Sequence, residues 1–491
     1  MHTHLGLQNA LELLPRANPS TGKPLPDGTF VMRVPTFAAI ASSIASLVPA
    51  SSAFCAEVTT QMTPEQGYGA NPTLPAPDKS LIPVVNVAEA KPWQLDQAPT
   101  PAKGLAVSRF ACELDHPRWL YVLPNGDVLV AETNAPERPA DSKGIRGYFQ
   151  DRAMRKAGAN VPSANRITLL RDANSDGAPE VRTRFIEGLN SPFGMTLIGN
   201  QLYVANTDAV VRFDYEAGAT EIKRQGTKFA DLPGGPINHH WTKNLIASPK
   251  GDKLYATVGS NSNAAENGIE AEDKRASIWE IDATTGASRV FASGLRNPNG
   301  MDWQPQSGAL WTVVNERDEI GHNLVPDYLT SVQEGGFYGW PYSYFGNHVD
   351  ERVKPQRPDL VAKAIVPDYA LGSHTASLGL VFYDADLLPD KYRNGAFIGM
   401  HGSWNREPRS GYKVVFVSFA NGRPIGLPED VLGGFIGPKG EARGRPVAVA
   451  VGHDGALLVA DDVGNCVWRV TPAGSQVSQA ANASASEAAI R

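Results

Sequence analysis

A short unit of two apolar strands joined by a tight turn recurs along this chain of 491 residues. In each copy the turn places Asn, Lys or Asp before a glycine, and the second strand ends on a small or acidic residue. The clearest copies, and the third strands that accompany the repeat, span residues 119–132, 210–214, 244–259, 277–282, 447–462 and 467–470. With residues 192–206, 301–315 and 378–418, the chain holds about six units at uneven spacing. The sequence therefore predicts an all-β fold, a six-bladed β-propeller with loop and short helical insertions.

Composition agrees with such a fold and narrows the class of ligand. The chain has 47 Gly and 38 Pro against 7 Met, as expected for many tight turns between short strands. Its net charge of −6 argues against nucleic-acid and anionic-membrane partners, because both are bound through fields of Lys and Arg. No apolar run reaches the roughly 20 residues of a membrane span. A small molecule is therefore the expected ligand.

The chain is expected to divide into four parts. These are upstream residues with a signal peptide (1–56), a linker or N-terminal extension on the surface (57–105), the propeller (106–472) and a disordered tail (473–491). Met32 and Arg33 precede an apolar run over 37–47 and a zone of small residues ending at Ala56, the order found in export signals. We take Met32 as the start of translation and expect a periplasmic or secreted protein.

Two cysteines remain after export with certainty, Cys112 near the start of the predicted ring and Cys466 near its end. They would form a disulfide across the ring closure or stay two buried thiols.

Two segments interrupt the repeat. Lys143–Gly158 is basic and predicts a helical insertion on the surface. Asp172–Gly177 resembles the start of a calcium loop, but Thr183 stands where an EF-hand has its bidentate glutamate. The second segment is therefore predicted to be a polar hairpin turn.

Four loop segments depart from the repeat and carry histidines and several cations. They are Asn238–Lys243, Gly294–Gly300, His401–Arg406 and Arg443–Arg445. Loops next to strands are where a propeller gathers residues around its central channel.

At these residues the chain resembles the soluble quinoprotein sugar dehydrogenases, which use pyrroloquinoline quinone (PQQ), and most closely their sorbosone and aldose sugar dehydrogenase types. The resemblance runs from about 116 to 470, and its most specific strings are His116–Asp127, Leu295–Gly300, Val314–Glu319, Gly336–Pro341 and His401–Arg406. It implies a six-bladed propeller with PQQ in the channel and calcium both at the cofactor and at a structural site.

The candidate cofactor ligands follow from charge. PQQ carries several carboxylates, and holding them in a partly dry channel requires cationic donors. The candidates are Arg296, Arg443, Arg445, Arg406 and Lys243, with Asn297 beside Arg296. Arg443 and Arg445 are two apart, so an extended backbone would project them to the same side. The resemblance implies that both contact the cofactor.

His240, rather than His239, is the candidate general base and a candidate cofactor contact, because the family's catalytic histidine lies in this loop. A neutral imidazole can take the hydroxyl proton as hydride leaves the same carbon. Arg296 and Asn297 are then expected to hold the quinone carbonyl and its developing negative charge.

The resemblance also implies metal ligands. Glucose dehydrogenase relatives bind the cofactor calcium through a Gly-Pro pair that is missing here, so main-chain oxygens at Glu316 and Arg317 are the substitutes. Glu319 would offer a carboxylate, and Tyr338 a main-chain carbonyl, to the structural calcium.

The predicted function is PQQ-dependent oxidation of a sugar, a sugar aldehyde such as sorbosone, or a polyol, with a cytochrome or a quinone as electron acceptor. A calcium-dependent propeller lactonase is the alternative enzyme, but it would need side-chain carboxylates around an open metal and no cationic clamp. A non-catalytic propeller that binds glycan or protein would leave the His and Arg loops without a purpose.

Overall fold

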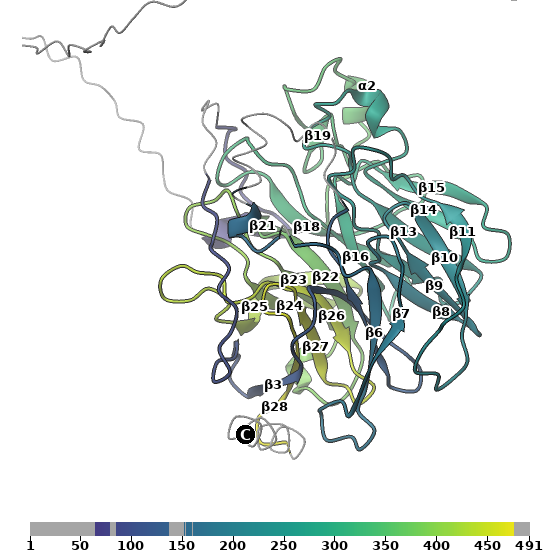
Figure 1. Ribbon diagram of the computed structural model, residues 1–491. Coiled ribbons are helices and arrows are strands. Elements are labelled where there is room, and N and C mark those ends of the chain that lie inside the picture. Colours follow the sequence, from purple (N-terminus) through teal and green to yellow (C-terminus); the bar gives the residue numbers. More distant parts are fainter. Residues whose placement is uncertain (1–63, 79–84, 137–151, 153, 160, 476–491) are drawn as a thin grey trace, which may run out of the picture. The chain divides into compact units, whose positions relative to one another are not determined.

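The computed structural model describes residues 64–78, 85–136, 152, 154–159 and 161–475, which belong to one compact unit. Their strands form six antiparallel sheets of four or five strands, arranged as the blades of a propeller (Figure 1). The predicted fold class is thus confirmed. The predicted signal peptide, most of the predicted insertion Lys143–Gly158 and nearly all of the predicted tail lie outside the described residues.

Each blade is a meander whose strands follow the predicted repeat. The first three blades consist of β4 (Pro117–Val122), β5 (Val128–Glu132), β6 (Arg166–Arg171) and β7 (Val181–Ile186); β8 (Met195–Ile198), β9 (Gln201–Ala205), β10 (Ala209–Asp214) and β11 (Thr227–Asp231); and β12 (Leu245–Ala247), β13 (Lys253–Val258), β14 (Ser277–Asp282) and β15 (Ser288–Ser293). Their apolar side chains alternate between the two faces of each sheet and pack against the neighbouring blades.

The other three blades recruit strands from the N-terminal side of the chain. They consist of β16 (Pro298–Trp303), β17 (Leu310–Val314), β18 (Pro326–Ser331), β21 (Tyr369–Ser373) and β1 (Tyr68–Gly69); β22 (Ser377–Tyr383), β23 (Gly395–Met400), β24 (Lys413–Ala420), β25 (Arg423–Gly433) and β2 (Thr100–Pro101); and β26 (Pro446–Val451), β27 (Leu457–Asp461), β28 (Cys466–Pro472) and β3 (Leu105–Ala111). The described part of 57–105 therefore lies along the blades and adds two outer strands to them.

Insertions between strands contain few regular elements among the described residues. They hold the hairpin of β19 (Ser343–Tyr344) and β20 (His348–Val349), the helix α2 (Pro358–Val361) and the 3-10 turns Pro64–Gly67, Ile269–Glu272 and Asp390–Tyr392. The Asp172–Gly177 segment forms the turn between β6 and β7, where the Asp172 carboxylate accepts the backbone N–H groups of Asp176 and Gly177. None of the helices in the described ranges is long and apolar enough to cross a membrane.

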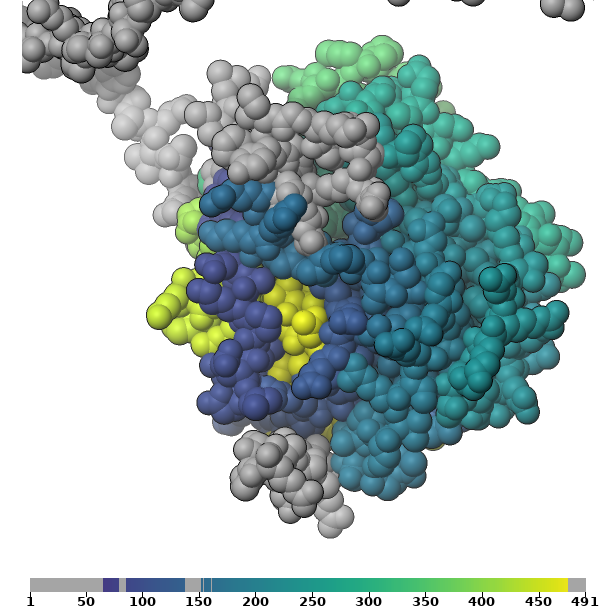
Figure 2. Space-filling view, viewed as in Figure 1, coloured from purple at the N-terminus to yellow at the C-terminus, as the bar shows by residue number. Residues whose placement is uncertain are grey.

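The ring closes where the two ends of the propeller meet. β3 pairs with β28 as the outer strand of the last blade, and Cys112 and Cys466 form a disulfide directly beside this pair. Figure 2 shows the N-terminal residues in purple beside the last strands in yellow. Of the two states left open by the sequence, the cysteines adopt the bonded one, and the bond links residues 354 apart in sequence.

Candidate cofactor and active site

All four predicted segments open at one end of the ring. The inner strands, β4, β8, β12, β16, β22 and β26, contact their ring neighbours, and neighbouring strands within a blade are antiparallel. Loops that lead into an inner strand therefore lie at the same end as loops that leave the second strand of a blade. Asn238–Lys243, Gly294–Asn297 and Arg443–Arg445 lead into inner strands, and His401–Arg406 leaves β23.

His240 precedes β12 and has a defined tautomer. Its Nδ1 lies 2.9 Å from both the carbonyl oxygen and the Oγ of Ser260. The Ser260 hydroxyl donates its hydrogen to the Ser262 carbonyl at 2.6 Å, so both of its groups act as acceptors toward the ring. Nδ1 must then carry the hydrogen, which leaves a lone pair on Nε2. This is the protonation state that a general base requires.

The imidazole is held neutral. Burial and the nearby Arg296 guanidinium keep the pKa of His240 well below its usual value. Gly259 lies against the ring, since a Cβ there would overlap both His240 Cβ and Asn297 Oδ1. That Asn297 oxygen is buried and has no hydrogen-bond partner among the described groups. The His240 side chain and the free Asn297 Oδ1 therefore lie next to each other, both against Gly259.

Arg296 anchors what we name the Arg296 cluster, formed by Arg296, Asp318, His374 and Asn405. Its guanidinium is 4% exposed and donates from Nη1 to the Glu316 carbonyl at 2.7 Å and from Nη2 to Asn263 Oδ1 at 2.8 Å. Nη2 also lies 3.6 Å from Asp318 Oδ2. Arg296 therefore fixes two loops and leaves none of its nitrogens without an acceptor.

Asp318 is the centre of this cluster. Its Oδ1 accepts Asn405 Nδ2 at 2.8 Å and lies 3.2 Å from His374 Nδ1. Burial raises the pKa of Asp318, but the His374 hydrogen bond and the Arg296 charge outweigh it and bring that pKa to about 2. Because His374 Nε2 donates to the Gly321 carbonyl at 3.0 Å, both ring nitrogens face acceptors. Burial lowers the pKa of His374, yet Asp318 raises it overall, so the ring is a cation beside a carboxylate.

A second group, the Asp462 cluster, comprises Asp462, His116, Arg118, His401 and Arg445. The Asp462 carboxylate accepts Arg118 Nη1 at 2.7 Å and lies 2.9 Å from His401 Nε2. Although burial works in the opposite direction, the neighbouring His401, His116 and Arg118 lower the pKa of Asp462 far below its usual value. One ionised carboxylate thus faces one guanidinium group, while burial and the charge of Arg445 lower the pKa values of both Arg118 and His401.

The arginines of the Asp462 cluster have N–H groups without an acceptor among the described groups. Arg118 stacks on Trp241 at 5.7 Å and Arg445 stacks on Tyr412 at 4.9 Å, measured from the guanidinium carbon to the ring centroid. Arg118 Nε and Arg445 Nε and Nη2 are buried without a hydrogen-bond partner among the described groups. Arg445 is 5% exposed, so its charge is largely removed from solvent. Such a cluster needs an anion, because buried unpaired cations cost several kcal/mol.

The two clusters belong to one site. Trp241, under Arg118, is the neighbour of His240 in the chain. The loop after β23 places His401 on Asp462 and Asn405 on Asp318. Segments from several blades therefore converge here, and they carry His240, Arg296, Asn297 and Arg445.

The other predicted cations lie differently. Lys243 is fully buried and donates to the carbonyls of its own loop, those of His240 at 3.3 Å and Trp241 at 3.2 Å. Arg406 donates to the His322 carbonyl and to Asn323 Oδ1, both at 3.0 Å. These two side chains hold loops of the site in place.

Arg443 also departs from the expected arrangement. It stacks on Trp93 at 6.0 Å, whereas Arg445 lies on Tyr412, so the two arginines contact different parts of the chain. The prediction that an extended backbone would project both guanidinium groups to the same side therefore does not agree with these contacts. The glycine between the two arginines packs against Asp461.

The predicted calcium residues are engaged with each other. Arg317 is fully buried, and its guanidinium contacts Glu316 Oε2 at 3.0 Å, Asp350 Oδ2 at 3.1 Å and the Ser343 carbonyl at 2.7 Å. The Glu316 carbonyl accepts Arg296. A guanidinium thus fills an oxygen-lined space of the kind that suits a cation. A metal would find main-chain oxygens at Glu316 and Arg317 and the buried Glu316 Oε1, which has no hydrogen-bond partner among the described groups.

The second predicted calcium pair lies in two separate loops. Glu319 is exposed with φ of 71°, near the charge of Arg352. Tyr338 is buried, and its hydroxyl donates to the Ser331 carbonyl at 2.6 Å. Among the described residues, the carboxylates that could converge on a metal ion are instead Asp172, Asp176 and Glu180, in the β6–β7 turn.

Comparison with known proteins assigns the family. The sequence model of the TrAA12-like family matches residues 162–334 and 360–473, more than half of the chain. The chain belongs to the TrAA12-like family. The match includes every member of the two clusters except His116 and Arg118. The predicted membership of the soluble PQQ-dependent sugar dehydrogenases is confirmed at family level.

Relatives of this TrAA12-like chain include two named enzymes. The aldose sugar dehydrogenase YliI of Escherichia coli is 26% identical over 35% of this chain and 48% of its own length. A PQQ-dependent pyranose dehydrogenase of Coprinopsis cinerea is 23% identical over 64% of this chain and 44% of its own length. The chain therefore spans less than half of each. A Trichoderma reesei structure of family AA12 has a TM-score of 0.63 at 17% identity, covering 78% of this chain and 100% of that one. It shows the fold.

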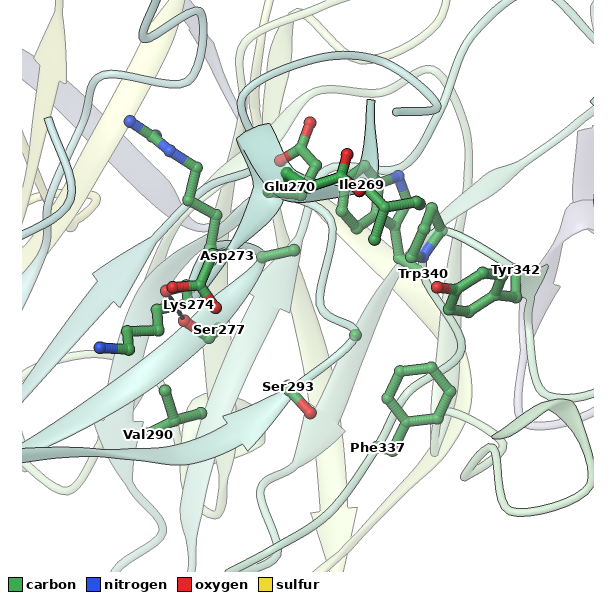
Figure 3. Close-up of a pocket in the computed structure, with 15 residues that line it drawn as sticks. Ile269, Glu270, Asp273, Lys274, Ser277, Val290, Ser293, Phe337, Trp340 and Tyr342 are labelled. Atoms are coloured by element: carbon green, nitrogen blue, oxygen red, sulfur yellow. Dashed lines mark hydrogen bonds between the residues drawn. The ribbon is translucent and has the colours of Figure 1, made fainter. Parts of the chain in front are cut away.

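The TrAA12-like chain also has a cavity of about 720 Å³ away from both clusters. Figure 3 shows Phe337, Trp340 and Tyr342 along one side of it. Its wall borders loops of the site, since Trp340 Nε1 donates to the Asn263 carbonyl at 3.0 Å and Arg275 Nη1 donates to Asn238 Oδ1 at 2.9 Å. This cavity is distinct from the place where His240 and Arg445 lie.

Proposed function

We propose that this chain is a PQQ-dependent oxidoreductase that oxidises a sugar, a sugar aldehyde such as sorbosone, or a polyol. The proposal depends on one observation, the kind of polar atom left without a partner. In the Asp462 cluster these atoms are guanidinium nitrogens and His116 Nε2, and the guanidinium groups suit the carboxylates of PQQ. Near His240 and in the Arg296 cluster they are the amide oxygens of Asn297 and Asn405, respectively, which suit hydroxyl groups. The two named relatives, both sugar dehydrogenases, support it.

The residues present fit the cofactor. Arg118 and Arg445 would hold its carboxylates, and Asn297 would lie at its reacting end beside His240. When bound, the quinone supplies the two-electron acceptor for a hydride. His240 takes the hydroxyl proton on Nε2, while Ser260 keeps the ring oriented through Nδ1. The reacting carbon, which belongs to an alcohol, a hemiacetal or a hydrated aldehyde, thereby loses one hydride and its oxygen one proton, and a carbonyl forms.

Arg296 and Asp318 act by preorganisation. Their contacts fix the loops that carry Asn297, Glu316 and Asn405 before substrate arrives, so little reorganisation accompanies proton transfer. Calcium is proposed to bind main-chain oxygens at Glu316 and Arg317 and, at a second site, Glu319 and Tyr338. The proton transfer to His240 does not depend on calcium. Arg443, Arg406 and Lys243 are proposed to support the cofactor site through the loops that they hold.

Export of the protein is also proposed. The disulfide between Cys112 and Cys466 supports it, because such bonds persist mainly in oxidising compartments.

The decisive experiment is reconstitution. Purified chain is incubated with PQQ, with and without calcium, and dye reduction is followed with aldoses, sorbosone, other aldehydes and polyols. Turnover that requires PQQ is expected. No turnover with any substrate, despite bound PQQ, would contradict the proposal.

The variant His240→Ala tests the base. We expect a loss of kcat of at least 100-fold with PQQ binding retained, as is typical when a positioned general base is removed. His239→Ala is the matched control, because His239 is the exposed neighbour in the same loop. Equal activity of the two variants would assign the base elsewhere.

A further inference from the structure

One tryptophan of this protein, Trp404, is exposed to solvent. All nine tryptophans lie in the described part of the chain, and eight of them are buried or half-buried. Trp404 is 41% exposed, and no other Phe, Tyr or Trp of the described residues is as open to solvent. Leaving an indole in water forgoes the burial of a large apolar surface, which normally stabilises a fold.

The exposure of Trp404 does not come from a loose loop. Ser403 donates its N–H to the Ser410 carbonyl at 2.9 Å, and the Ser403 carbonyl accepts the Tyr412 hydroxyl at 2.8 Å. The Trp404 carbonyl accepts the Asn86 N–H at 2.7 Å. Its neighbours Ser403 and Asn405 are 1% and 7% exposed. The backbone is therefore fixed on both sides, and the indole is held outside the packed interior.

Trp404 also lies in the loop that joins the two clusters. Three residues before it, His401 contacts Asp462 at 2.9 Å, and directly after it Asn405 donates to Asp318 at 2.8 Å. The buried Asn405 Oδ1 has no partner among the described groups. An open indole and a free amide oxygen thus adjoin each other in sequence at the end of the ring where His240 lies.

We propose that Trp404 is a stacking platform for the ring of a pyranose and so a specificity-determining residue. This inference rests on the proposed function. A pyranose has one face of C–H groups, which an indole face can cover and remove from water, while its hydroxyls reach acceptors such as Asn405. An open-chain aldehyde or polyol has no such rigid face and loses more conformational freedom on binding. Trp404 therefore favours cyclic sugars over open-chain substrates.

The test compares substrates in the PQQ-reconstituted full chain. For Trp404→Ala we expect KM for D-glucose or D-xylose to rise about tenfold with kcat changed less than about twofold, a binding loss of roughly 1.4 kcal/mol. KM for glyceraldehyde or sorbitol should stay within about twofold. Trp404→Phe should restore most of the pyranose affinity. Leu427→Ala is the control, because Leu427 is 52% exposed on β25, outside the loop.

Unchanged pyranose KM in Trp404→Ala overturns the proposal, as does an equal rise for open-chain substrates. A change confined to the rate with a cytochrome acceptor also overturns it and makes Trp404 an acceptor contact. Saturation-transfer NMR with D-glucose separates this inference from the proposed function, since it needs no turnover. Transfer from indole protons to the sugar ring, lost in Trp404→Ala, supports the platform even if no sugar is oxidised. Absence of transfer in the wild-type chain contradicts it.

Discussion

The Arg296 cluster and the Asp462 cluster are built from similar residue types but differ in which atoms they leave unused. In the Arg296 cluster every nitrogen of Arg296 and His374 faces an acceptor, and only the Asn405 amide oxygen remains free. In the Asp462 cluster the carboxylate is engaged by Arg118 and His401, and guanidinium nitrogens and His116 Nε2 remain without a hydrogen bond. The first arrangement is complete without a ligand and positions loops. The second lacks negative charge, and this is the physical difference between a scaffold and a binding site.

The largest effect is expected from breaking the complete cluster. Asp318→Asn leaves Arg296 and His374 with reduced compensation, and removing one partner of a buried ion pair typically costs 3–5 kcal/mol. Because the Asp318 side chain is 20% exposed, we expect the lower end, about 3 kcal/mol of unfolding free energy, measured by denaturant titration without PQQ. Asp231→Asn, which removes an exposed pair with Lys228, is the control and should cost less than about 1 kcal/mol. Equal losses in both variants would show that the Arg296 cluster is not a structural unit.

The opposite result is expected for the incomplete cluster. Arg445→Met removes a buried cation with unpaired nitrogens, so the PQQ-free chain should keep its unfolding free energy within about 1 kcal/mol. PQQ affinity should fall about 100-fold, roughly 2.7 kcal/mol, because a desolvated partner of an anion is lost. Arg184→Met changes an exposed arginine on β7 and should leave PQQ affinity unchanged. A variant that loses stability but binds PQQ normally would invert the assignment of the two clusters.

The sequence predicts the parts of this site that depend on local strings. His240, Arg296 and Asn297 lie in loops next to strands with a strong apolar pattern, so their end of the ring follows from the repeat. Arg118 and Asp318 lie in the family-like motifs His116–Asp127 and Val314–Glu319, and Asp462 ends a predicted second strand. Their roles cannot be predicted from these motifs, because a motif does not show which side chains meet between blades.

Other features had no local signal. His374 lies between β21 and β22, and its partner Asp318 is more than fifty residues away, so only the fold joins them. The strands β1 and β2 have two residues each, too few for a period to be visible. Lys243 and Arg406 show that a cationic side chain in a predicted site loop can bond to backbone carbonyls and so hold the conformation of a loop. The disulfide required the pairing of β3 with β28, which cysteine positions alone do not predict.

The smallest effect concerns pH and again separates the two clusters. The pKa of His374 is raised by Asp318, so the folded chain holds this proton more tightly than the unfolded chain does. Its stabilisation is then complete below the unfolded value of about 6.5 and is lost as pH rises through the folded value. Asp318, with a folded pKa of about 2, stays ionised throughout that window, and Asp327 is the other carboxylate near the ring.

Unfolding free energy of the wild-type chain should therefore fall above pH 6.5, and His374→Gln should flatten this part of the profile. His401 in the Asp462 cluster has the opposite shift, because burial lowers the pKa of His401, and the Asp462 carboxylate only partly offsets this. The folded chain therefore favours the neutral ring, and this contribution to stability is complete above the unfolded value of about 6.5 and is lost as pH falls through the lowered folded pKa. His401→Gln should then leave the slope above pH 6.5 as in the wild type. Denaturant titrations of both variants between pH 6 and 8.5 check this. Loss of the slope in His401→Gln alone would place the charged histidine in the Asp462 cluster and remove the distinction between a complete and an incomplete half of the site.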